Sequence, residues 1–212
     1  MKDPSQMNSF YKDAFQELGN IGAGNAATAL SQMVGRTIQT SVPKVLIVPI
    51  EKVPDIIGAG DQIVAGIYLK IFGDVPAKIL VTFEHAELLS LTDLLMGQPV
   101  GSSTVLNEMR LSALKELGTI LTGSFLNALA KFLDLQMIPT VPALAIDALS
   151  AILDTLLVEL SEEAQLALLI QTEIFETETK LAGNIFLIPE AGALDLMIKA
   201  IQKAAGVVVD AG

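Results

Sequence analysis

The sequence contains no cysteine and only one histidine, His85. The first absence excludes disulfides and thiol chemistry. With one histidine and no Asp or Glu clustered at ligand spacing, the chain is not expected to hold a transition metal of its own. Basic residues are also few, because 13 Lys and Arg stand against 24 Asp and Glu, for a net charge of −11. Since nucleic-acid phosphates require a basic surface, this balance argues against a nucleic-acid partner.

Long runs made only of apolar residues are missing as well. The mean hydropathy is high, +0.56, and residues 18–35 carry no charge. This run nevertheless contains Asn20, Asn25, Ser31 and Gln32, so it lacks the apolar density that a membrane span needs. We interpret it as a packed internal helix and expect no membrane insertion. No charged segment followed by an apolar one opens the chain, and we therefore expect a cytoplasmic protein.

A motif occurs twice in the chain, 99 residues apart. The segments ELGNIGAGNAATAL, residues 17–30, and ELGTILTGSFLNAL, residues 116–129, agree at seven of fourteen positions. Chance agreement would be about one position at ordinary residue frequencies. The chain is therefore predicted to be a duplicated unit whose chemistry lies where both copies keep polar residues. The aligned positions are Asp13, Glu17, Asn20 and Pro43 in the first copy and Ser112, Glu116, Thr119 and Pro142 in the second; a valine precedes both prolines.

Periodicity predicts the same order of elements in both halves. We expect an α/β fold in which two pseudo-symmetric halves, residues 10–100 and 107–205, form one domain that spans residues 1–212. A largely antiparallel, six-stranded sheet is expected beside two long helices that carry the motif. The expected helices are residues 10–33, 85–96, 107–133 with Asn107 as the N-cap, 148–157 and 191–204; the expected extended segments are residues 37–50, 63–72, 78–83, 136–146, 164–175 and 181–188.

The polar motif residues of the first copy share one face of their predicted helix. At 100° per residue, four positions fall within about 60° of one another: Asp13, Glu17, Asn20 and Gly24. The opposite face carries the apolar stripe that the protein can bury. A polar helix face is ordinarily its solvated side, but its retention in both copies indicates a function. The second helix divides in the same way, with Ser112, Glu116 and Thr119 on its polar face.

Glycine is frequent inside the first motif helix, although each one costs about 0.5–1 kcal/mol relative to alanine. Gly24 lies on the polar face and is expected to admit the close approach of a partner, whereas Gly22 lies on the buried face, where tight packing explains it. Residues 22–27 also fit the loose GxGxxA pattern of dinucleotide-binding folds. That pattern needs a buried strand before it, whereas residues 11–18 are charged and helically periodic. We therefore reject the dinucleotide alternative.

The arrangement Asp13-x3-Glu17-x2-Asn20, followed 23 residues later by Pro43, resembles the signature of the CheC-type chemotaxis phosphatases (CheC, CheX and FliY). The resemblance covers nearly the whole chain and includes the duplication, and the flanking sequences are most similar to CheC. It implies an α/β sandwich of two pseudo-symmetric halves.

The resemblance also implies a function. Members of this family hydrolyse the aspartyl phosphate of the response regulator CheY, often under regulation by the deamidase CheD, and their Glu and Asn project from a helix into the regulator's active site. Carried over, Glu17 is expected to bind a lysine of CheY, and Asn20 to position a water at the aspartyl phosphate. Asp13, Gly24 and Pro43 are expected to support the contact, Pro43 by shaping the loop behind the helix. The regulator is expected to supply Mg²⁺, so the chain needs no cofactor of its own.

The second copy departs from the pattern, because Thr119 replaces the asparagine. Threonine is shorter and β-branched, so its hydroxyl is expected to stay near the helix backbone and the second site is expected to be degenerate. A rival interpretation is a non-catalytic CheY-binding or flagellar-switch module, since the fold is also similar to the middle domain of FliM. The intact pair of Glu17 and Asn20 favours the enzyme.

Overall fold

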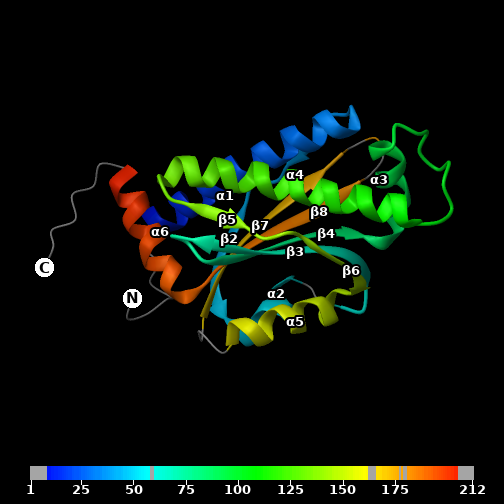
Figure 1. Ribbon diagram of the computed structural model, residues 1–212. Coiled ribbons are helices and arrows are strands. Elements are labelled where there is room, and N and C mark those ends of the chain that lie inside the picture. Colours follow the sequence, from blue (N-terminus) through cyan, green and yellow to red (C-terminus); the bar gives the residue numbers. More distant parts are fainter. Residues whose placement is uncertain (1–8, 58–59, 162–165, 177, 179–180, 205–212) are drawn as a thin grey trace, which may run out of the picture.

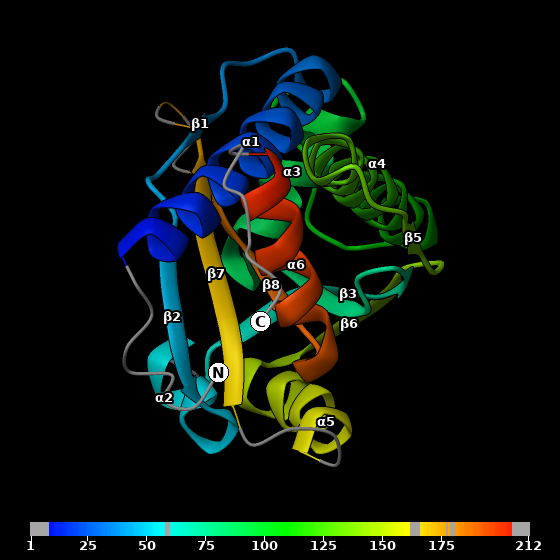
Figure 2. The ribbon, with the colours of Figure 1, turned by 90° about the vertical axis from the view of Figure 1, so that its left-hand side faces the viewer.

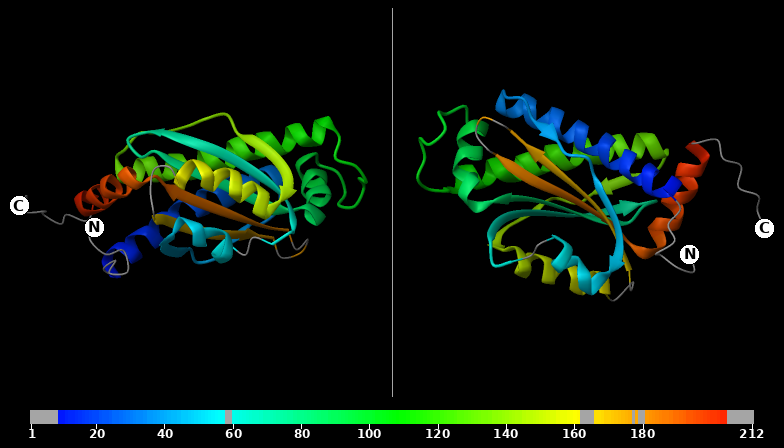
Figure 3. Two further views of the ribbon diagram at one scale, coloured as in Figure 1. Left: turned by 90° about the horizontal axis from the view of Figure 1, so that it is seen from below. Right: turned by 180° about the vertical axis from the view of Figure 1, so that it is seen from behind.

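The structure is a computed structural model that describes residues 9–57, 60–161, 166–176, 178 and 181–204. Helices lie on both faces of a curled antiparallel sheet (Figure 1). Two long helices lie side by side on one face, two shorter ones cover the other face (Figure 3), and one further helix lies at each end of the long pair. The long helices are α1 (Ser9–Val34) and α4 (Glu108–Leu133). The shorter ones on the other face are α2 (Val53–Ile57) and α5 (Leu149–Ser161), and the two at the ends are α3 (Leu88–Leu95) and α6 (Ala191–Ala204).

The sheet contains eight strands among the described residues, and each of the strand pairs is antiparallel. In chain order they are β1 (Gln39–Thr40), β2 (Lys44–Pro49), β3 (Ile63–Gly73), β4 (Ala77–Glu84), β5 (Met137–Pro139), β6 (Ala143–Ala148), β7 (Leu166–Phe175) and β8 (Ala182–Pro189). The spatial order is β1-β7-β8-β4-β3-β5, with β2 also on the outer edge of β7 and β6 also on that of β3.

The two halves of the chain exchange their edge strands. β2 of the first half pairs with β7 of the second, with Val45 opposite Ile170, and the two lie side by side in Figure 2. In the reciprocal pair, β6 adds to β3, with Leu144 opposite Ile67. At the centre β4 pairs with β8. The sheet therefore carries the pseudo-two-fold symmetry of the duplicated sequence.

The sheet separates two apolar cores, and strand β4 contributes to both. Side chains alternate across a strand, so Ile79 and Val81 pack into the larger core beneath α1 and α4, while Leu80 packs into the smaller core against α5. Because helices cover both faces, residues 77–83 are all buried. No helix in the described part of the chain is both long and apolar enough to cross a bilayer.

The two long helices approach closely at Gly22. A Cβ atom at this position would lie 2.6 Å from side-chain atoms of both Phe125 and Leu129 on α4. The aligned position in the second copy is Leu121, which is fully buried. A small residue on α1 thus makes room for large residues on α4, and this confirms tight packing as the reason for Gly22.

The predicted fold class is confirmed, with three corrections. The sheet has eight strands rather than six, because the two expected extended segments that contain the motif prolines, residues 37–50 and 136–146, are each divided into two strands. Pro43 and Pro142 lie in the breaks. Ala148 ends a strand rather than beginning a helix, and the short helix α2 was not expected in its Pro- and Gly-rich passage. Asn107 is the N-cap of α4, as predicted, since its Oδ1 accepts a hydrogen bond from the Arg110 backbone. Residues 164–165, which belong to an expected strand, and residue 205, the expected end of the second half, lie outside the described residues.

Candidate functional site

One face of α1 forms an exposed polar ridge, here called the α1 ridge and defined by Asp13, Glu17, Asn20 and Gly24. The first three side chains are exposed, whereas Leu18 behind them is fully buried. The apolar stripe of α1 is thus fixed against the sheet and against α4, while the polar side chains point away from the core. A rigid helix of this kind holds functional side chains more accurately than a loop does.

Glu17 and Asn20 lie next to each other on the ridge, one helical turn apart. The Nδ2 atom of Asn20 donates a hydrogen bond to Oε2 of Glu17 over 3.5 Å, which is the long limit for such a bond. Both side chains are exposed, and no Lys or Arg among the described residues forms an ion pair with Glu17. The carboxylate and the carboxamide therefore stand together in a position that a partner protein can reach.

The remaining α1 positions differ in their surroundings. A Cβ atom on Gly24 would meet nothing within 4 Å, so the ridge is open there. Gly19 instead faces inward, where its Cβ would lie 2.8 Å from Pro43 and 2.9 Å from Ile170. Pro43 is buried, and its carbonyl oxygen accepts a hydrogen bond from Gln16 Nε2 over 3.1 Å. Pro43 thus supports α1 from beneath.

The second copy places its motif on α4, and we call Ser112, Glu116 and Thr119 the α4 ridge. All three side chains are exposed, and Pro142 is half-buried. The Thr119 hydroxyl donates to the backbone carbonyl of Lys115 over 3.1 Å. This confirms that the hydroxyl stays on its own helix. Among the described residues, the side chains of Asn20 and Thr119 each bond within their own helix, and no hydrogen bond or ion pair joins the α4 ridge to the α1 ridge.

The α1 ridge is a projecting surface. A hollow of about 870 Å³ lies at the C-terminal ends of α1 and α3 and includes Gly35, Arg36 and Glu178, but neither Glu17 nor Asn20. In the described part of the chain, no three His, Asp or Glu side chains are grouped to hold a metal ion. Residues on such a ridge suit a substrate that brings its own cleft, such as another protein.

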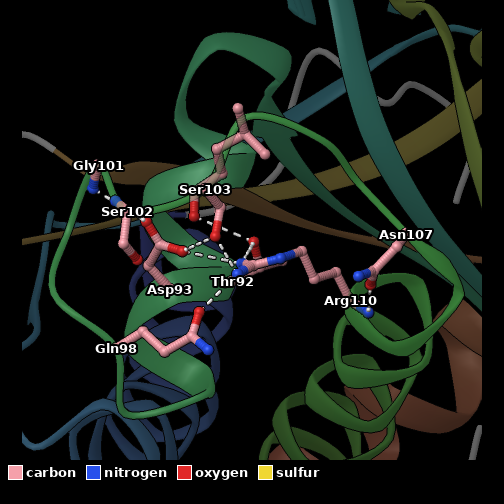
Figure 4. A network of polar contacts seen from close by, with 9 residues as sticks. Thr92, Asp93, Gln98, Gly101, Ser102, Ser103, Asn107 and Arg110 are labelled. Carbon is pink, nitrogen blue, oxygen red and sulfur yellow. Dashed lines mark hydrogen bonds and ion pairs between the residues drawn. The ribbon is translucent and has the colours of Figure 1, made fainter.

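Sequence reasoning missed a buried polar network between α3 and α4 (Figure 4). The Nη1 atom of Arg110 donates to Oδ1 of Asp93 over 2.9 Å and to the hydroxyl of Thr92 over 2.8 Å, while Nη2 donates to Gln98 Oε1 over 2.6 Å and to Ser103 Oγ. Arg110 is 6% exposed and Asp93 is fully buried. The signal in the sequence was a lone arginine in the apolar stripe of α4, which continues through positions 114, 117 and 121.

The network also fastens the linker between the two halves. The backbone N–H groups of Gly101 and Ser102 donate to Oδ2 of Asp93 over 2.9 and 3.1 Å. Burial alone would raise the pKa of Asp93, but hydrogen bonds from Ser103, Arg110 and Gly101, together with the arginine charge, outweigh burial and lower this pKa. The ionised carboxylate is therefore the form that holds the start of α4 in place.

A second perturbed carboxyl group lies at the start of α3. Burial raises the pKa of Glu87, the hydrogen bond that its Oε2 accepts from the Ala182 backbone lowers it, and the nearby charge of Glu84 raises it, with a net increase. Neither Glu87 nor Asp93 lies on a ridge. Their perturbed pKa values result from the packing around α3 and do not mark the candidate site.

Both copies of the motif also match a known protein family. The sequence profile of the CheC-like family matches residues 10–47 and 109–146, the two segments that contain the motif. The CheY-P phosphatase CheC of Bacillus subtilis (strain 168) is 33% identical over 193 residues, which cover 89% of this chain and 92% of that protein.

Two solved structures show that the fold is shared more widely. Thermotoga maritima FliY superposes with a TM-score of 0.72 at 20% identity, covering 94% of this chain and 99% of that chain. The FliM middle domain from H. pylori gives a TM-score of 0.61 at 12% identity, covering 92% of this chain and 99% of that one. These two likenesses establish the fold, while the sequence relationship to CheC is much stronger. The chain therefore belongs to the CheC-like family.

Proposed function

We propose that this protein is a chemotaxis phosphatase that hydrolyses the aspartyl phosphate of the response regulator CheY. The observation that supports it most is the exposed Glu17 and Asn20 pair on α1, in a chain whose 33% identical relative is named a CheY-P phosphatase. The ridge enters the regulator's active-site cleft, so the substrate is a protein and the chain itself needs no deep pocket.

In the proposed reaction, Asn20 positions the attacking water. The water oxygen attacks phosphorus in line, the bond between phosphorus and the regulator's aspartate oxygen breaks, and the electron pair leaves with the aspartate carboxylate. The two protons of the water stay with the inorganic phosphate that is released. Such a transfer depends chiefly on positioning and charge stabilisation. A carboxamide both donates and accepts hydrogen bonds and does not titrate, so Asn20 can orient a water without exchanging a proton with it.

Glu17 is proposed to bind a lysine of the regulator. A carboxylate paired with an ammonium group at a contact that excludes water gains a charge-assisted hydrogen bond and fixes the register of docking. The hydrogen bond between Asn20 and Glu17 is long, 3.5 Å, so replacing it with a bond from the regulator's lysine to Glu17 costs little free energy. Asp13, one turn earlier on the same exposed face, adds negative charge at the edge of the contact. Gly24 leaves space for the regulator.

The regulator is proposed to supply Mg²⁺, which would neutralise charge on the phosphoryl oxygens. The residues of this chain contribute docking and water positioning only. The α4 ridge keeps Glu116 but not the carboxamide, and the hydroxyl of Thr119 is turned to the Lys115 carbonyl. We therefore propose that the second copy does not accelerate hydrolysis. Regulation by CheD stays a prediction.

A direct test is to mix the protein with phosphorylated CheY and follow phosphate release. Accelerated release by the wild type, lost in Asn20→Ala and retained in Thr119→Ala, is the expected result. Because the FliM middle domain has the same fold, binding of phosphorylated CheY without faster release would instead support a non-catalytic module. Circular dichroism of both variants serves as the control for folding, since both positions are exposed.

A further inference from the structure

An exposed valine precedes the motif proline in each copy. Val42 is 69% exposed and Val141 is 89% exposed, and they are the two most exposed large apolar side chains among the described residues. They occupy aligned positions, 99 residues apart. A single exposed apolar residue is common on protein surfaces, but the same exposure at the same place in both copies requires a more specific account.

The loop before each valine is fastened to the neighbouring strand by two hydrogen bonds. The backbone N–H of Ser41 donates to the carbonyl of Glu173 over 2.9 Å, and the backbone N–H of Glu173 donates to the Ser41 hydroxyl over 3.1 Å. In the second copy, Thr140 makes the same two bonds with Lys70, over 2.9 and 3.1 Å. Each hydroxyl takes the place of a backbone carbonyl in the strand pairing, so the backbone next to the valine is held on β7 or β3.

On its other side the first loop is fastened to α1. The Pro43 carbonyl accepts from Gln16, and the Pro43 ring lies against Gly19. Gln16 directly precedes Glu17 and Gly19 directly precedes Asn20 in the sequence, and Asn20 lies one helical turn after Gln16. Val42 directly precedes Pro43 and is thus held on a loop that is anchored at both ends and lies against the turn of α1 that carries Asn20.

We propose that Val42 is part of the docking surface for the phosphorylated response regulator, where it contacts an apolar patch beside the regulator's active site. This inference rests on the proposed function, because it takes the partner of the α1 ridge to be that regulator. An apolar contact next to Glu17 and Asn20 excludes water from the polar interactions and so strengthens them. Val42 is a positioning residue for docking and has no part in the chemical step.

The test uses the full chain and three variants, Val42→Ala, Val42→Thr and Val141→Thr. Threonine keeps the β-branched shape and the preference for extended backbone but adds a hydroxyl. We expect both Val42 variants to raise the Kd for beryllofluoride-activated CheY, and the KM for CheY-P, by about tenfold, with kcat unchanged. Val141→Thr, on the loop that Thr140 fastens to β3 by the same two strand bonds in the degenerate copy, is expected to behave as the wild type.

The outcomes separate this inference from the proposed function. If Val42→Thr binds as the wild type does while Val42→Ala binds weakly, valine is needed only for loop conformation and the inference is overturned. If all three variants keep the wild-type Kd and the wild type hydrolyses CheY-P, the inference is wrong and the proposed function stands. If the wild type binds without hydrolysis and Val42→Thr binds more weakly, docking at Val42 stands and the proposed catalysis falls. A wild type that neither binds nor hydrolyses contradicts both.

Discussion

A Cβ atom on Gly19 would lie 2.8 Å from the Cβ of Pro43, so the helix that carries the candidate site rests directly on the proline of its own motif. Real Cβ contacts are not this short. The glycine therefore allows α1 to approach the loop before β2. The same contact fixes the position of α1 relative to the motif proline. In the second copy the corresponding Gly118 lies against Ile67 of β3 instead.

Replacing Gly19 with alanine is expected to lower the free energy of unfolding by about 1–3 kcal/mol, because the added methyl group overpacks a closed contact. Gly24→Ala is the matched control on the same helix. Its Cβ would meet nothing within 4 Å, so the helix propensity of alanine should raise stability by about 0.5–1 kcal/mol. Urea unfolding of the two variants measures both effects, and a stabilised Gly19→Ala would show that Pro43 does not support α1 in this way.

The buried pair of Asp93 and Arg110 is expected to dominate the acid sensitivity of the protein. Asp93→Asn leaves Arg110 as an unpaired buried charge and should cost about 3–5 kcal/mol at neutral pH. The pKa of Asp93 is lowered from its ordinary value of 3.8, so the contribution of the carboxylate is present above that value and is lost as the pH falls through the lower, folded-state pKa. Denaturant unfolding of the wild type and the variant from pH 7 to pH 3 should show the difference shrinking in acid.

The exposed pair of Lys203 and Asp134 provides the control for this prediction. Its side chains are 75% and 83% exposed, and surface ion pairs contribute about 0–1 kcal/mol. Asp134 has a positive φ of 55°, which asparagine also adopts readily, so Asp134→Asn removes the charge without straining the backbone. Equal losses of stability in Asp93→Asn and Asp134→Asn would contradict the importance of the buried network.

Glu87→Gln is expected to stabilise the protein at neutral pH. The pKa of Glu87 is raised above 4.5, chiefly by burial, so the folded state favours the protonated form and ionisation costs stability as the pH rises through the folded-state pKa. Glutamine stays neutral, and its side-chain oxygen can still accept from the Ala182 backbone. Thermal unfolding should show the advantage of the variant at pH 7 disappearing below pH 4.5. A variant that is less stable at pH 7 would contradict the sign of this shift.

The exchange of edge strands leads us to propose that the two halves fold only together, as one domain. A fragment of residues 1–104 lacks β7, with which β2 pairs from Lys44 to Pro49, and it lacks the Phe125 and Leu129 side chains that cover Gly22. We expect this fragment to show no cooperative unfolding transition by circular dichroism, and to regain one when mixed with residues 105–212. A cooperative transition in the isolated fragment would contradict the proposal.

Local patterns in the sequence predicted the parts of the fold that depend on short-range periodicity. The boundaries of α1 and α4 follow from apolar residues at helical spacing, and Asn107 was identifiable as a cap from its residue type and place. The strand pairing was not predictable in the same way, because β2 and β7 are more than 100 residues apart and pair across the two halves. The duplication indicated symmetry but did not show which strands are exchanged.

The candidate site, like the fold, was predictable from the sequence only in part. The helical wheel predicted that Glu17 and Asn20 are exposed on one face, and the structure confirms this. The shape of threonine predicted that the Thr119 hydroxyl stays near its own helix, which the bond to the Lys115 carbonyl confirms. The sequence did not reveal the ion-pair partner of Arg110, because Asp93 lies on another helix and no sequence periodicity relates the two positions. The catalytic roles of Glu17 and Asn20 stay predictions.

The most direct test of the account is single-turnover hydrolysis of CheY-P by Asn20→Ala, at protein concentrations that saturate the regulator. Saturation separates the positioning of water from docking, since every regulator molecule is then bound. We predict that hydrolysis falls to the regulator's own unassisted rate, while the Kd for beryllofluoride-activated CheY stays within a factor of about two. Hydrolysis that remains accelerated in Asn20→Ala would contradict the claim that this carboxamide directs the attacking water.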